Sequence, residues 1–136
     1  MNPLLRDLLD HQLWADVEHW NTMAAHSAAR EDPVIHNRLH HVHLTQRMFV
    51  WVTGDRAKPF VPSRPEEFPS FDALRDYARD SHEDILRRRN GMSDTQLNAT
   101  IDEPDFPKDP PLVITGSEAL MQMAMHSQWH RGQNAT

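Results

Sequence analysis

The sequence predicts an all-α protein, a four-helix bundle formed by one domain over residues 1–136. The prolines fall in groups that leave four long proline-free intervals, and proline breaks helix interiors. Residues that cap helices stand near the starts of these intervals. Apolar residues recur within the intervals at the spacing of an amphipathic helix. Four such helices, joined by connections of uneven length, are typical of a bundle.

The first interval predicts a helix from about Pro3 to Ala29, because leucine and alanine dominate it. Its opening stretch, MNPLLRDLLDHQLW, carries acidic residues among the leucines and has no small-residue cleavage site. We therefore expect the first helix of the bundle here, rather than a secretory signal peptide.

The second helix is expected to open with Asp32 as N-cap and Pro33 in the first helical position, and to end near Gly54. The third is expected to begin after Ser70, another N-cap residue, and to end at Asn90-Gly91. Phe71, Leu74, Ala78, Ile85 and Leu86 give it an apolar face.

The fourth helix opens with Thr115-Gly-Ser-Glu118, a capping box, and runs to the end of the chain. Before it lie two apolar patches, Leu97–Ile101 and Leu112–Ile114, separated by a loop rich in proline and aspartate. They are either short extended segments or anchors of a loop. The longer second and third connections would let helices cross the bundle instead of strictly alternating up and down.

Composition excludes several functions. The net charge of -6 argues against a nucleic-acid or anionic-membrane partner, and no run approaches the 18 apolar residues of a membrane span. There is no cysteine, so we expect no disulfide, thiolate metal site or cysteine nucleophile. The lysines are Lys58 and Lys108, and the glycines are never clustered. The chemistry must come from His, Asp, Glu, Tyr77 or a bound metal, and we expect a cytoplasmic protein.

Two histidine pairs, His36/His40 and His126/His130, have one-turn spacing, which is not specific in a chain with ten histidines. Position on the helices is more informative. At about 100° per residue, His43 lies at the edge of the apolar stripe of the second helix, and His126 and His130 lie together beside that of the last. We therefore predict that His43, His126 and His130 converge on a metal ion.

Three neutral imidazoles suit Zn(II), Ni(II) or Fe(II) and leave coordination positions open, as in catalytic sites. Gln46, Gln122 and Asp16 are candidates to orient the rings. The alternative is that these are ordinary, half-exposed histidines on helix flanks. We expect His82 to fill the core, and six histidines to lie at the surface: His11, His19, His26, His36, His40 and His41.

Some apolar residues on two helices lie away from the core stripe: Met121, Met125, Trp129, Met48 and Trp51. A bundle helix needs only one apolar face, so a second one suggests an interface. We predict a homodimer packed through the second and fourth helices. The alternative is that this stripe packs beneath residues 92–114 of the same subunit.

Three short patterns match those of a known protein family in order and spacing. They are Leu13-Trp14-Ala15-Asp16, His43 eight residues before Trp51, and His126-x-x-x-His130-Arg131-Gly132-Gln133. On these the chain resembles the DinB/YfiT-like family of helical-bundle metalloproteins. The resemblance implies an up-down-down-up bundle, often dimeric, with zinc or nickel held by three histidines. The family's last helix usually continues well past this string, so we expect either a truncated sequence or a shorter final helix.

The resemblance implies a thiol-dependent S-transferase or isomerase acting on a small-molecule substrate, or a hydrolase-like enzyme. The thiol would be a low-molecular-weight cosubstrate such as bacillithiol, mycothiol or glutathione, and the metal would bind and ionise it. Asp16 and Glu118 are candidate bases, while Tyr77 and Arg131 bind substrate or brace helices. Two alternatives stay open: a non-catalytic stress-response dimer that holds a metal or small ligand, and a plain helical dimer without a site.

Overall fold

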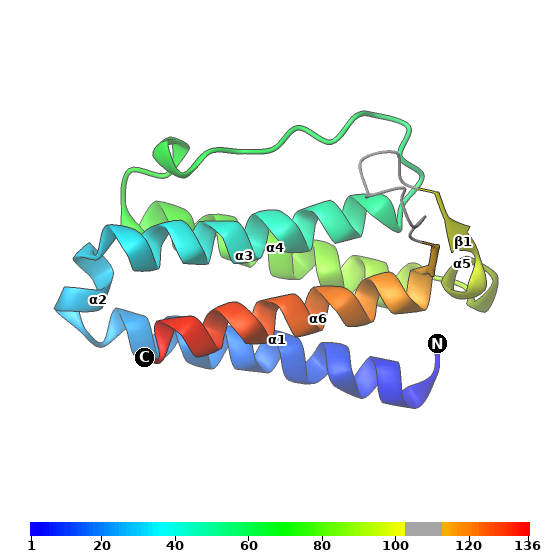
Figure 1. Ribbon diagram of the computed structural model, residues 1–136, viewed down its shortest axis with the longest axis horizontal. Helices are drawn as coiled ribbons and strands as arrows, with labels where there is room; N and C mark the ends of the chain where they lie inside the picture. Colours follow the sequence, from blue (N-terminus) through cyan, green and yellow to red (C-terminus); the bar gives the residue numbers. More distant parts are fainter. Residues whose placement is uncertain (103–112) are drawn as a thin grey trace.

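The computed structural model describes residues 1–102 and 113–136 (Figure 1). Four long helices form the body of the protein: α1 (Pro3–Ala24), α3 (Pro33–Val52), α4 (Phe71–Gly91) and α6 (Gly116–Asn134). Shorter elements join them: α2 (Ser27–Glu31), the 3-10 turn η1 (Pro65–Glu67), α5 (Asp94–Asn98), β1 (Thr100–Ile101) and β2 (Ile114–Thr115). Within these described ranges the protein is all-α, as predicted, apart from one two-residue antiparallel pairing of β1 with β2.

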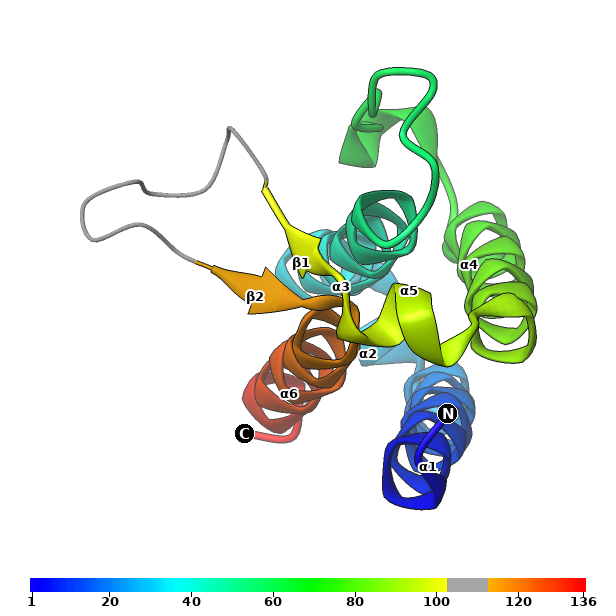
Figure 2. The same ribbon diagram turned by 90° about the vertical axis from the view of Figure 1, so that its right-hand side faces the viewer.

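The long helices lie side by side, with α1 and α6 running in one direction and α3 and α4 in the other (Figure 1). The connection over residues 53–70 carries the chain back along the length of the bundle, so that α4 begins at the same end as α3. Figure 2, a view close to the helix axes, shows α5 and the strand pair at one end. Helix α3 packs against both α4 and α6, and α1 packs against α6.

Helices α3, α4 and α6 begin at the positions that their capping residues predict. The Asp32 side chain accepts hydrogen bonds from the first backbone N–H groups of α3, at 2.7 and 3.2 Å. Ser70 accepts one at the start of α4, and Thr115 and Glu118 form a reciprocal capping box on α6. Such caps pair backbone donors that have no partner within the helix.

The first helix is shorter than predicted. It ends at Ala24 rather than Ala29, and His26, in an extended conformation, separates it from α2. No proline or glycine marks this break, and α2 buries no residue. The turn is set by the need to bring α3 back against the bundle, since tertiary packing overrides weak local helix propensity.

The apolar patches near residue 100 are also only partly as expected. Leu97 is a buried residue of α5 and Ile101 is a buried residue of β1, so a short helix precedes the extended segment. Leu112 lies outside the described residues. Leu86, expected on the apolar face of α4, is 39% exposed.

The core has two apolar ends and a polar middle. One apolar cluster gathers near the start of α1 and the end of α3: Leu5, Leu9, Phe49, Val52, Ile85, Met92, Leu97, Ile101, Ala119, Leu120 and Met123. The other lies near the end of α1 and the start of α4: Trp20, Met23, Leu39, Phe71, Leu74 and Ala78. Between them along the helices are buried polar residues: Gln12, Asp16, His43, Gln46, Ser81 and Ser127.

In the described ranges, 1–102 and 113–136, no helix combines the length and the apolar character needed to cross a membrane.

Candidate metal centre

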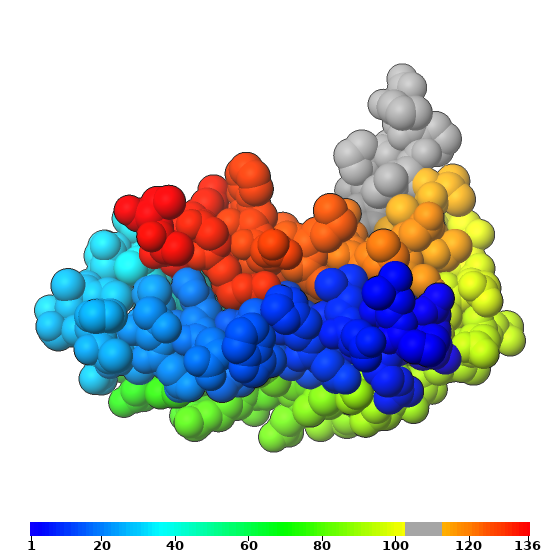
Figure 3. Space-filling view, turned by 90° about the horizontal axis from the view of Figure 1, so that it is seen from below, coloured from blue at the N-terminus to red at the C-terminus, as the bar shows by residue number. Residues whose placement is uncertain are grey.

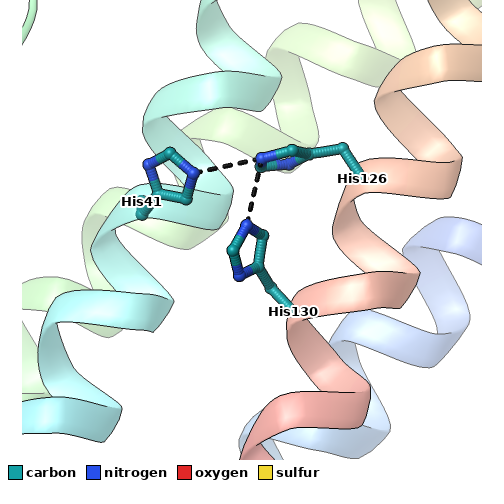
Figure 4. A group of neighbouring side chains, drawn as sticks. All are labelled: His41, His126 and His130. Atoms are coloured by element: carbon teal, nitrogen blue, oxygen red, sulfur yellow. Dashed lines mark hydrogen bonds between the residues drawn. The ribbon is translucent and has the colours of Figure 1, made fainter.

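Three histidines from two antiparallel helices converge at the α3–α6 contact (Figure 4). The Nε2 atom of His126 lies 3.1 Å from Nε2 of His41 and 3.2 Å from Nε2 of His130. The ring centroids lie 4.5 to 4.9 Å apart. One nitrogen from each ring therefore points into the same small volume, as the ligands of a single metal ion would.

The tautomer of His130 suits metal binding. Its Nδ1 lies 2.7 Å from Oε1 of Gln133, and a carbonyl oxygen can only accept a hydrogen bond. Nδ1 therefore carries the proton, which leaves the lone pair of the neutral ring on Nε2, the atom that faces His126. Gln133 thus orients His130 through its second nitrogen, as the partners of metal-bound histidines usually do.

The surroundings of His126 and His41 favour the neutral form of these two rings. Burial, together with the neighbouring His130 and His41, lowers the pKa of His126 to about 4. Burial and the proximity of His130 also lower the pKa of His41 from its ordinary value. These two rings are therefore not protonated at neutral pH, as metal binding requires. His41 is exposed and the other two rings are partly exposed, so a bound ion would be reachable from solvent and could keep an open coordination position.

His43 does not lie with His126 and His130, and His41 stands where His43 was expected. Two residues along a helix turn the side chain by about 200°, so these two histidines point to opposite flanks of α3. The flank with His41 faces α6, whereas His43 is buried toward α1. Helix periodicity identified the apolar stripe of α3 but not which flank of it the last helix would cover.

His43 has a different environment, with both ring nitrogens bonded. Trp20 Nε1, which can only donate, donates to Nε2 at 2.8 Å. Nδ1 therefore carries the proton and donates to Gln46 Oε1, also at 2.8 Å. Burial lowers the pKa of His43 to about 4, although Asp16 nearby opposes this. His43 is a neutral link in a hydrogen-bond chain and has no lone pair left for a metal.

That chain continues to Asp16, which is 2% exposed. Gln46 Nε2 donates to Asp16 Oδ2 at 2.6 Å, and Gln12 Nε2 donates to the same oxygen at 2.8 Å. On the other side Arg131 donates to Oδ1 at 2.5 Å, and His82 lies 3.3 Å from Oδ2.

Burial alone would raise the pKa of Asp16, but the hydrogen bond to His82 and the electrostatic influence of His43, Arg131 and His82 lower it to about 2. Asp16, His43 and His82 also lie close enough together to surround an ion. Asp16 and His43 already accept hydrogen bonds from neighbouring side chains outside the group: Trp20, Gln12, Gln46 and Arg131. We therefore interpret this group as a structural network.

The end of α6 is anchored on three sides. Besides the bond from Arg131 to Asp16, Arg38 of α3 donates to the backbone oxygen of Gln133 at 3.0 Å. Asn134 lies 3.1 Å from His19 of α1. Terminal turns otherwise fray because their last carbonyls lack partners. These contacts support His130 close to the end of the helix.

Several other residues that the sequence singled out make structural contacts. Tyr77 braces the 53–70 connection, because its hydroxyl is bonded to Ser63, which also contacts His40. Trp51 donates to the backbone oxygen of Lys58 in the same connection. Glu118 serves its capping box, and Gln122 is exposed, away from the buried network. Contrary to expectation, His40 is buried and only 3% exposed.

The outer side of α6 remains apolar and open. Met121, Met125 and Trp129 are 44%, 60% and 68% exposed, so they do not pack beneath the described part of residues 92–114. A shallow cavity of about 580 Å³ lies over this side, lined by Met125, Gln128, Trp129, Gly132, Gln133 and Thr136. Figure 3 shows α6, in orange and red, lying along α1, in blue.

Comparison with known proteins agrees with this architecture. The DinB superfamily matches the chain over residues 6–134, which includes all four long helices almost entirely. Neither the curated proteins nor the solved structures include a significant match. With a family match over nearly its whole length, and with histidines grouped where they could hold a metal ion, the chain belongs to the DinB superfamily.

Proposed function

We propose that His41, His126 and His130 bind one divalent metal ion, zinc or nickel, through their Nε2 atoms, and that the protein is a metal-dependent enzyme. The observation that carries the proposal is the convergence of these three nitrogens at the α3–α6 contact. Their donor set fits zinc and nickel, which imidazole nitrogens bind well.

Three protein ligands would leave one coordination position of the metal open, which favours a catalytic metal site over a structural one. Structural zinc sites usually close all four positions with protein ligands, whereas three-ligand sites leave one for water or substrate. An ion bound here would supply Lewis acidity, which lowers the pKa of a bound water or thiol. Gln133 would hold His130 in its binding tautomer, and the exposure of His41 would let the substrate approach.

The reaction class we propose is S-transfer or isomerisation that depends on a low-molecular-weight thiol. The chain has no cysteine, so the thiol must arrive as a cosubstrate. We place the protein in the cytoplasm, where thiols are kept reduced. The competing function is a stress-response module that holds the metal without catalysis, and it predicts stoichiometric metal but no thiol transfer.

The test is the metal content of untagged protein, measured by mass spectrometry for wild type, His126→Ala and His11→Ala. His11 is an exposed histidine of α1 that contacts Trp14, so it serves as a matched control. We expect about one ion per chain in wild type and in His11→Ala, and almost none in His126→Ala. Wild type that holds no metal, even after incubation with zinc or nickel, would refute the proposal. A screen of thiols with electrophilic substrates then separates enzyme from binding module.

We also propose a homodimer, packed through the outer side of α6. The exposed Met121, Met125 and Trp129 support it, because exposed aromatic and methionine side chains are typical of interfaces. Trp51 does not contribute, since its indole is bonded within the subunit. Trp129→Glu should sediment as a monomer. Trp14→Glu, which changes a tryptophan of α1 that is 60% exposed, should stay dimeric. A dimeric Trp129→Glu protein would contradict this surface.

A further inference from the structure

The buried polar network holds the residue that follows each histidine of α6. Ser127 follows His126, and its hydroxyl is bonded to Nε2 of Gln46 at 3.1 Å. Arg131 follows His130, and it donates to Asp16 Oδ1 and, at 3.0 Å, to Gln12 Oε1. Residues four apart lie on the same face of a helix, so Ser127 and Arg131 form the inner face of these turns.

The orientation of this inner face determines the direction in which His126 and His130 point. One residue further along turns the helix by about 100°. With Ser127 and Arg131 held toward the centre of the bundle, His126 and His130 are therefore directed sideways, to α3 and His41, as Figure 4 shows. A rotation of α6 would displace both Nε2 atoms together and leave His41 without its partners.

Apolar packing does not hold this half of α6. Its buried apolar residues end at Ala124, and the only buried residue after that point is Ser127. Apolar contacts are non-directional, whereas hydrogen bonds have preferred distances and angles. The polar contacts therefore determine the rotation of the segment that carries the two histidines.

We propose that Asp16 of α1 is a positioning residue for the metal centre. Its carboxylate bonds neither His126 nor His130, and acts through Arg131, which fixes the rotation of α6 and so sets where the Nε2 atoms meet His41. The inference rests on the proposed metal site. It adds that the metal affinity and coordination geometry of that site depend on a carboxylate buried among four helices. Side chains from each of these helices lie within hydrogen-bonding distance of the carboxylate: Gln12 of α1, Gln46 of α3, His82 of α4 and Arg131 of α6.

The experiment compares Asp16→Asn with Asp10→Asn. Asp10 is a matched control, because it is also an aspartate of α1 bonded to an arginine, Arg89 at 2.8 Å, but that bond ties α1 to α4. Zinc affinity is measured by competition with a chelator, and the visible absorption of bound Co(II) reports the coordination geometry. We expect Asp16→Asn to weaken zinc binding about 10- to 100-fold and to alter the Co(II) spectrum, while Asp10→Asn matches wild type.

The outcomes separate this inference from the proposed function. Wild type that binds no metal refutes the metal site itself. Wild type that binds zinc while Asp16→Asn shows the same affinity and spectrum overturns only the positioning role, even if that variant melts at lower temperature. Equal weakening in Asp10→Asn also overturns it. If Asp16→Asn does not fold, Arg131→Lys decides, because it keeps the charge but removes the guanidinium whose Nη1 bonds both Asp16 and Gln12. Weaker binding supports the inference, and unchanged binding overturns it.

Discussion

Replacing His43 by alanine should destabilise the fold and largely preserve metal binding. The substitution leaves the indole N–H of Trp20 without an acceptor and Gln46 Oε1 without its donor. Each buried group that loses its partner costs about 1–3 kcal/mol, so the free energy of unfolding should fall by roughly 2–6 kcal/mol. The Asp16–Arg131 pair remains in this variant, so zinc affinity should stay within about tenfold of wild type, less than a displaced ligand would cost.

His41→Ala should have the opposite effects. His41 is exposed, and surface substitutions usually change stability by less than about 0.5 kcal/mol. Removing one of three ligands should nevertheless weaken zinc binding by more than roughly 100-fold, the upper range seen when residues that only orient the ligands are changed.

Two assays on metal-free protein measure both effects: urea unfolding followed by circular dichroism, and zinc titration of the folded protein. A folded His43→Ala protein that fails to bind zinc, together with a His41→Ala protein that binds like wild type, would refute this assignment of the two histidines.

Three further predictions concern pH, ring orientation and ligand binding. His43 stays neutral in the native protein down to its lowered pKa of about 4, whereas the unfolded chain protonates it near its ordinary pKa of 6.5. The free energy of unfolding should therefore fall as the pH drops from 6.5 to about 4. Urea unfolding midpoints should show this fall, and it should be less steep in His43→Gln. Gln133→Ala should weaken zinc binding about tenfold by calorimetric titration, with exposed Gln128→Ala unchanged. Zinc at about 1,000 times its Kd should stabilise wild type by about 4 kcal/mol in thermal unfolding, whereas His130→Ala should show little shift.

The helices and their starts could be predicted because the signals are local. Asp32-Pro33, Ser70 and the Thr115–Glu118 box each act on the backbone within a turn of their own position, so no distant contact is needed to interpret them. The break at His26 could not be predicted, because no residue there opposes a helix and only the return of α3 against the bundle imposes the turn.

Four capped helices could be predicted from the sequence, and so could the shared flank of His126 and His130 on the last helix, because i and i+4 neighbours follow from helix geometry alone. That their neighbour on α3 is His41 follows from the packing of the helices. His43 borders the apolar stripe of α3, whereas His41 lies about 200° away from it on the opposite flank, and which flank meets α6 depends on how the helices pack around the buried Asp16 network. That network joins residues up to 119 positions apart, and such contacts leave no periodic signal in the sequence.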